Sequence, residues 1–182
     1  MRSVQAQIED HIKACLLLKH KSRLLQKISK VISSSFKSGG KLILCGNGGS
    51  AADSQHVAAE FVGKFLKWRR PLPAMALSSN SSVITALGND IGQEDIFARQ
   101  INAFANPGDV VAGITTSGLS PNVLFALQQA QNSGCVTVAF TGIRKIDSVD
   151  FCLSVSSKST PRIQEVHMLA WHIICGAVEN EF

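Results

Sequence analysis

The sequence predicts a single α/β domain built on a parallel sheet, and three observations support this. Five short apolar runs alternate with longer segments in which apolar residues recur every three or four positions. Strands that alternate with helices are joined by right-handed crossovers and form a parallel sheet. Polar clusters follow the end of every predicted strand, and open α/β sheets bind ligands along that edge. We therefore expect ligand-binding residues in the loops that follow the strands.

Residues 4–38 are predicted to be helical, as one long helix or two broken ones. Apolar residues recur there at spacings of three and four, and Gly39-Gly40 supplies a helix stop. We divide the single domain, residues 1–182, into an N-terminal helical segment (1–38) and an α/β core (39–182). The predicted strands are residues 42–45, 74–77, 110–114, 136–140 and 151–155. The predicted core helices are the segment after the first strand and residues 83–87, 94–104, 121–133 and 161–179.

The composition indicates a globular protein. Of its 182 residues, 45% are hydrophobic and 17% charged, and no apolar run approaches the ~20 residues of a membrane span. The five cysteines are dispersed without a C-x-x-C pair and the N-terminus lacks a signal-peptide pattern, so we expect a cytoplasmic protein. The net charge of +5 fits either a nucleic acid or a small anionic substrate, and no basic run interleaved with aromatic residues favours the first.

The glycine turn, residues 46–50 (Gly-Asn-Gly-Gly-Ser), follows the first predicted strand and precedes a helix. Such a turn aims free N–H groups and the positive end of the helix dipole at one point, which suits a phosphate or a carboxylate. We expect Ser50 or Asp53 to cap the helix. A dinucleotide turn would need an acidic residue about 20 positions on, where Ser78-Ser79-Asn80 stands instead. Taken alone, the turn fits a purely structural role as well as anion binding.

The hydroxyl loop, residues 115–120 (Thr-Thr-Ser-Gly-Leu-Ser), stands between the third predicted strand and a predicted helix. Hydroxyls together with free backbone N–H groups can bind a phosphate without any lysine. An ordinary Ser/Thr helix cap is the alternative. Because the glycine turn and the hydroxyl loop both follow strands, they share one sheet edge, and together they favour a phosphorylated ligand.

Two further groups of titratable residues are candidates for chemistry. His56 and Glu60 stand four positions apart on a predicted helix and therefore on the same face. His167 and His172 lie among apolar residues of the last predicted helix. Each of these two histidines, taken alone, is more typical of a core residue than of a ligand or an acid.

In combination these residues resemble a known family over nearly the whole chain, the sugar isomerase (SIS) domain proteins of the phosphoheptose isomerase type. The matching blocks are CGNGGSAADSQHVAAEFVG, LPAMALSSNSSVITALGND, DIFARQ, PGDVVAGITTSGLSPNVL and TPRIQEVH followed by His172. The resemblance implies a flavodoxin-like α-β-α sandwich with a five-stranded parallel sheet and an N-terminal helical extension. It also implies a homotetramer with active sites at subunit interfaces.

The activity that the resemblance implies is an aldose–ketose isomerisation. Sedoheptulose 7-phosphate is converted through an enediolate to D-glycero-D-manno-heptose 7-phosphate, the first step towards ADP-heptose and the core of bacterial lipopolysaccharide. Such a reaction needs a base, an acid and stabilisation of a negatively charged oxygen.

The resemblance also assigns roles to individual residues. Glu60 corresponds to the catalytic base and His172 to the catalytic acid. One zinc ion per subunit is implied, with His56, Glu60, Gln164 and His172 as its ligands. The positions assigned to substrate binding are Asn47, Gly48, Gly49, Ser50, Asp90, Thr115, Thr116, Ser117, Ser120 and Gln164.

The sequence departs from the family pattern at three places. Lys64 stands where arginine is common, Leu119 replaces a commoner asparagine, and residues 143–150 form a shorter segment without the family's glycine pair. These departures concern efficiency and substrate breadth rather than the class of reaction.

The spacing of Gln164 and His172 bears on oligomerisation. Eight residues on a regular helix are separated by about 12 Å of rise and about 80° of rotation, so one compact site can hardly use both from one straight helix. We therefore expect an obligate oligomer with composite sites, in which one chain supplies Gln164 with the glycine-turn helix and a neighbour supplies His172.

Two other classes of function stay open at this point. One is a non-catalytic SIS-domain protein of the replication-initiator-associating type, whose members lack a glutamate and a histidine at the positions of Glu60 and His172. The presence of both residues here favours an enzyme. The other is a sensor that binds a sugar phosphate without converting it, and a turnover assay separates it from an isomerase.

Overall fold

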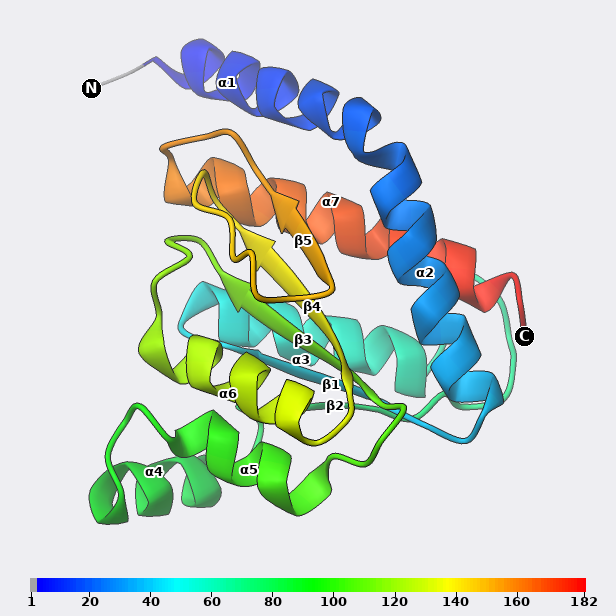
Figure 1. Cartoon of the computed structure of the whole chain (residues 1–182). Coiled ribbons are helices and arrows are strands. Elements are labelled where there is room, and N and C mark those ends of the chain that lie inside the picture. Colours follow the sequence, from blue (N-terminus) through cyan, green and yellow to red (C-terminus); the bar gives the residue numbers. More distant parts are fainter. Residues whose placement is uncertain (1–2) are drawn as a thin grey trace.

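All five predicted strands form a sheet in the computed structural model, which describes residues 3–182 (Figure 1). The strands pair in the order β2-β1-β3-β4-β5, and every neighbouring pair is parallel. Their bounds are β1 Leu42–Gly46, β2 Ala74–Ala76, β3 Val110–Thr115, β4 Val136–Thr141 and β5 Phe151–Ser154. The strand order reverses between β1 and β3, and in such sheets the ligand crevice opens at that point, beyond the carboxyl ends of the two strands. The glycine turn follows β1 and the hydroxyl loop begins with the last residue of β3.

The helices agree with the predicted segments. The N-terminal segment is two helices joined by a short 3-10 helix at Leu18–Lys21, and the two residues that precede the described part of the chain, 1–2, lie outside it. α2 ends at Lys37, just before Gly39, whose φ of 83° matches the predicted glycine stop. The bounds are α1 Val4–Leu17, α2 Ser22–Lys37, α3 Gly49–Val62, α4 Ser81–Asp90, α5 Ile96–Phe104, α6 Pro121–Asn132 and α7 Thr160–Glu179.

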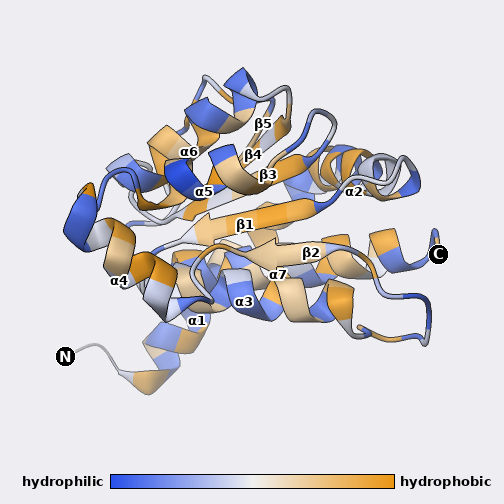
Figure 2. Cartoon of the chain, turned by 90° about the horizontal axis from the view of Figure 1, so that it is seen from below, coloured by the Kyte–Doolittle hydropathy of each residue, from blue (hydrophilic) through white to orange (hydrophobic). Residues whose placement is uncertain are grey.

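The sheet separates two apolar cores because successive side chains of a strand point to opposite faces. In β1, Leu42 and Leu44 belong to the core covered by α2, α3 and α7, whereas Ile43 and Cys45 belong to the core covered by α5 and α6. Figure 2 shows the apolar strands between these two helical layers. The result is the predicted α-β-α sandwich. Within the described residues, no helix is both long and apolar enough to cross a membrane.

His167 of α7 is part of the first core, as expected for a histidine among apolar residues. Its side chain is fully buried, and its Nε2–H donates a hydrogen bond to the carbonyl oxygen of Thr141 at 3.0 Å. Burial lowers the pKa of His167 to about 4, although the hydrogen bond to Thr141 acts in the opposite direction. The imidazole is therefore neutral at neutral pH.

The buried His167 is expected to make the protein less stable in acid. Because its pKa is lower in the folded chain than in the unfolded one, the unfolded chain binds more protons between about pH 6.5 and pH 4. The contribution to stability is complete above about pH 6.5 and falls by up to about 3 kcal/mol as the pH approaches 4. His167→Gln retains a side-chain donor for Thr141 but cannot titrate. Urea unfolding of both proteins at pH 7 and pH 4.5 should show a smaller loss for His167→Gln, and an equal loss would contradict this account.

Candidate active site

The helices α3 and α7 pack side by side and run in the same direction. Near the start of α7, Gln164 lies against Gly49, the first residue of α3. Further along, His172 of α7 lies against His56 of α3. The contacts between the two helices thus continue over about two turns. This pairing joins residues that are 116 positions apart in the sequence.

The acid–base cluster, which we define as His56, Glu60 and His172, lies on the facing sides of these two helices. Nε2 of His56 is 3.0 Å from Nε2 of His172 and 3.2 Å from a carboxylate oxygen of Glu60. The ring of Phe65 stacks on His172, with ring centroids 5.5 Å apart. The side chain of Glu60 is 20% exposed and that of His56 is 49% exposed, so a small molecule can reach both.

The acid–base cluster also has the donors of a metal site. One ligand atom from each of its three residues lies within 4.8 Å of the other two. Two imidazole nitrogens and one carboxylate oxygen suit Zn²⁺, and three protein ligands leave a coordination position for another group. The residues present therefore fit the metal that the resemblance implies.

The end of α3 is held in place by a buried ion pair that the sequence analysis missed. Arg69 donates hydrogen bonds to the carbonyl oxygens of Glu60 and Phe61 at 2.7 and 2.8 Å. Glu179 of α7 lies 3.6 Å from Nε of Arg69 and accepts the backbone N–H of Leu66 at 2.8 Å. These contacts secure the helical turn that carries Glu60. No sequence signal could reveal the ion pair, because Arg69 and Glu179 lie more than a hundred residues apart.

The glycine turn is connected to the first turn of α6, which follows the hydroxyl loop. The side chains of Asn47 and Asn122 donate hydrogen bonds to each other's amide oxygens at 2.8 and 3.0 Å. Gly48 has a φ of 53°, which favours glycine, and it is the residue that precedes α3. The predicted cap by Ser50 or Asp53 is wrong, because both residues lie inside α3, and Ser50 is almost fully buried there.

The hydroxyl loop is held together by its own side chains. Oγ1 of Thr115 lies 2.9 Å from Oγ of Ser120 and 3.2 Å from Oγ of Ser117. Ser120 precedes α6 but makes no side-chain cap bond, so the alternative of an ordinary Ser/Thr cap does not describe it. The hydroxyls therefore converge next to the first turn of α6, where free N–H groups favour an anion.

Gln164 and Asp90 are not among the three residues of the acid–base cluster, although Gln164 lines one cavity together with His172. Gln164 lies so close to Gly49 that a Cβ on this glycine would overlap its amide, whereas His56 follows about 10 Å further along α3. Asp90 is exposed at the end of α4 and accepts a hydrogen bond from Asn89 at 2.8 Å.

The expected division of the site between chains needs a correction. We expected His172 to come from a neighbouring chain, but it meets His56 and Glu60 of its own chain. Gln164 and His172 contact different turns of α3, at Gly49 and His56 respectively. Their spacing along α7 therefore does not require that a second chain supplies His172.

Comparison with known proteins agrees with this architecture. A family model described as SIS domain matches residues 7–142, which is most of the chain. The chain belongs to the SIS domain family. Among relatives of this SIS domain, the phosphoheptose isomerase of Roseiflexus sp. is 50% identical over 160 residues, which cover 86% of the chain and 81% of the relative. That of Clostridium acetobutylicum is 45% identical over 184 residues, which cover 98% and 94%.

Solved structures are similar over almost the whole SIS domain. The phosphoheptose isomerase GmhA from Neisseria gonorrhoeae has a TM-score of 0.91 at 34% identity and covers 97% of both chains. A phosphoheptose isomerase from Francisella tularensis has a TM-score of 0.86 at 30% identity, over 98% of this chain and all of the other.

Two cations of this SIS domain also escaped the sequence analysis. Arg144 follows β4 and Lys158 follows β5, and together with Thr116 and Ser117 they line an open cleft of about 550 Å³. The rule that ligands bind beyond the carboxyl ends of parallel strands could have singled out both loops. It could not indicate which side chains face the hydroxyl loop.

Proposed function

We propose that this SIS domain is a phosphoheptose isomerase that converts sedoheptulose 7-phosphate to D-glycero-D-manno-heptose 7-phosphate. The observation that carries the proposal is the acid–base cluster, in which a carboxylate and an imidazole meet on a chain that also has a loop of converging hydroxyls. Relatives that share this name at 45% to 50% identity cover most of the chain. The product would enter the synthesis of ADP-heptose and lipopolysaccharide.

The proposed mechanism moves one proton between neighbouring carbons. The Glu60 carboxylate removes a proton from C1 of the ketose, while His172 donates a proton to the oxygen on C2. His172, now neutral, then takes the proton from the enediol oxygen on C1, and Glu60 returns the carbon-bound proton to C2. A positioned general base and a positioned general acid typically contribute 10²–10⁴-fold each.

Zinc is a proposed cofactor, one ion per subunit. His56, Glu60 and His172 would hold it, and the metal would supply Lewis-acid stabilisation of the negative oxygen. Gln164 is the fourth proposed ligand; it lies against Gly49 of its own chain and lines one cavity together with His172. The roles of Glu60 as base and as ligand compete for the same lone pairs.

The oligomer is proposed to be a homotetramer with active sites between subunits. On one chain, Glu60 lies about 16 Å along α3 from Gly49, and the hydroxyl loop adjoins that end of the helix. A site shared between chains would bring the glycine turn, the hydroxyl loop and Gln164 of one chain to the acid–base cluster of another.

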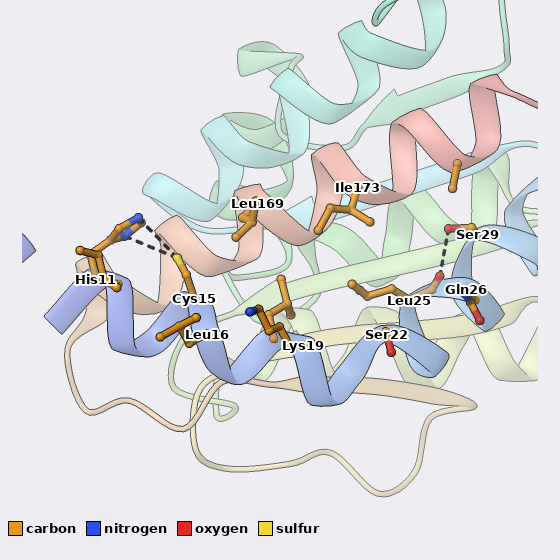
Figure 3. Close-up of a pocket in the computed structure, with 13 residues that line it drawn as sticks. His11, Cys15, Leu16, Lys19, Ser22, Leu25, Gln26, Ser29, Leu169 and Ile173 are labelled. Carbon is orange, nitrogen blue, oxygen red and sulfur yellow. Dashed lines mark hydrogen bonds between the residues drawn. The ribbon is translucent and has the colours of Figure 1, made fainter. Parts of the chain in front are cut away.

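Apolar surface on the N-terminal helices supports an oligomer. Figure 3 shows a groove between α1, α2 and α7 with Leu16, Leu25, Leu169 and Ile173 on its walls, and its volume is about 530 Å³. Four apolar residues on one side of α1 are at least half exposed: Val4, Ile8, Ile12 and Leu16. Surfaces of this kind are typical of contacts between subunits. All five cysteines are free, which agrees with the proposed cytoplasmic location.

The test is a coupled turnover assay with sedoheptulose 7-phosphate, with and without a chelator. An isomerase converts the ketose, and removal of zinc should lower the rate. Binding of the sugar phosphate without any conversion would instead support the sensor.

The hydroxyl loop is expected to bind the phosphate of the substrate. Ser120→Ala removes a hydroxyl that lies 2.9 Å from Thr115, and Ser117→Ala removes its neighbour at 3.2 Å. Each change should weaken binding by about 1–3 kcal/mol, because each removes a hydrogen bond to a charged group. Steady-state kinetics should show this chiefly as a higher KM. Ser133→Ala, at the other end of α6, is the control, and an unchanged KM in both loop variants would place the phosphate at the glycine turn.

A further inference from the structure

The cleft beside the hydroxyl loop has the composition of an anion site. Its polar lining residues are Thr116, Ser117, Ser157, Thr160, Arg144 and Lys158. No aspartate or glutamate lines it. The cleft is therefore positive in charge, and its lining includes Thr116 and Ser117 of the hydroxyl loop.

The segment after β4 packs directly against the hydroxyl loop. The backbone N–H of Gly142 donates a hydrogen bond to the carbonyl oxygen of Thr116 at 3.1 Å, and a Cβ on Gly142 would overlap that oxygen. On the other side, a Cβ on Gly118 would lie 2.7 Å from the carbonyl oxygen of Arg144 and 3.1 Å from its Cβ. The side chain of Arg144 thus starts in contact with the hydroxyl loop.

Neither cation is engaged elsewhere in the described part of the chain. Arg144 and Lys158 are exposed, and over residues 3–182 no hydrogen bond or ion pair holds either of them. Asp150 belongs to the same β4–β5 connection as Arg144. Its carboxylate accepts hydrogen bonds from the N–H and the hydroxyl of Thr137, both at 2.8 Å. The two positive charges are therefore available to a ligand.

A phosphate monoester carries close to two negative charges at neutral pH. The hydroxyl loop can donate hydrogen bonds to it but contains no cation of its own. We propose that Arg144 and Lys158 form a cationic clamp that binds the phosphate group of the substrate from across the cleft. The clamp rests on the proposed function and extends it. Besides the hydroxyl loop, the loops that follow β4 and β5 would contribute to the affinity for the phosphate dianion, through Arg144 and Lys158. It also gives the short segment 143–150 a role, since that segment carries Arg144.

The clamp is tested by titrating the full-length protein with inorganic phosphate in a calorimeter and by steady-state kinetics. Arg144→Ala should weaken phosphate binding roughly five- to tenfold and Lys158→Ala roughly two- to fivefold, because charged hydrogen bonds at exposed positions are worth little more than this. KM should rise by similar factors while kcat stays within about twofold, because the clamp touches the phosphate and not the reacting carbons. Both effects should shrink in high salt, and Arg144→Lys should recover part of the loss.

Lys145→Ala is the matched control, because it removes the same charge from the next residue, which does not line the cleft. Phosphate affinity of the Arg144→Ala/Lys158→Ala double variant equal to that of Lys145→Ala would overturn the clamp, whether both are unchanged or both are reduced alike. The result is independent of the proposed activity. If the wild type converts no sedoheptulose 7-phosphate, the function is wrong, and the phosphate titration still decides whether the clamp exists.

Discussion

Replacing Glu60 with glutamine is expected to lower turnover by roughly 10²–10⁴-fold, the usual contribution of a general base. Glutamine has the shape of glutamate, and the amide can still lie beside His56, which is 3.2 Å from the carboxylate. The fold and the hydroxyl loop should therefore be unaffected. Only the ability to accept a proton from carbon is removed.

The measurement is kcat with sedoheptulose 7-phosphate, together with the affinity for inorganic phosphate. Glu9→Gln, at an exposed position of α1, is the matched control and should retain full activity. Turnover of Glu60→Gln within a few-fold of the wild type would show that another group is the base. A loss of phosphate affinity of the same size would show that the change had disturbed the fold instead.

Mixing two inactive variants is expected to restore activity only when their defects lie in different halves of the site. The acid–base cluster is complete within one chain, and the hydroxyl loop lies at the far end of α3. If a site combines the hydroxyl loop of one chain with the acid–base cluster of another, Glu60→Gln and the Ser117→Ala/Ser120→Ala double variant should complement each other. With random exchange between two chains, about a quarter of the sites would have both halves intact.

The control mixture combines Glu60→Gln with His172→Gln. Both changes fall in the same acid–base cluster, so every site keeps one defect and the mixture should stay inactive. Activity is assayed at low substrate concentration after subunit exchange has been verified by mass. Recovery in the control mixture but not in the first would mean that Glu60 and His172 of one site come from different chains. Recovery in neither would contradict a shared site.

The architecture could be predicted from the sequence because it depends on local patterns. Runs such as residues 42–45 suit strands buried on both faces, and alternation with helical segments dictates parallel pairing. The glycine turn and the hydroxyl loop were recognisable for the same reason: each is one continuous stretch at the end of a strand. The start of the helix after β1 was predicted less accurately. Neither Ser50 nor Asp53 caps α3, because Gly48 already occupies the cap position and the helix begins at Gly49.

The sequence by itself determined the α/β fold, the two polar loops and the residue types available for acid–base chemistry. Only the tertiary structure decided which of those residues meet. His172 contacts His56 and not Gln164 because the parallel packing of α3 and α7 matches each turn of one helix with a turn of the other. Arg69 and Glu179, and the cations Arg144 and Lys158, became visible only in the fold. A sequence records the order of side chains along one chain, whereas contacts between distant segments depend on how the elements pack.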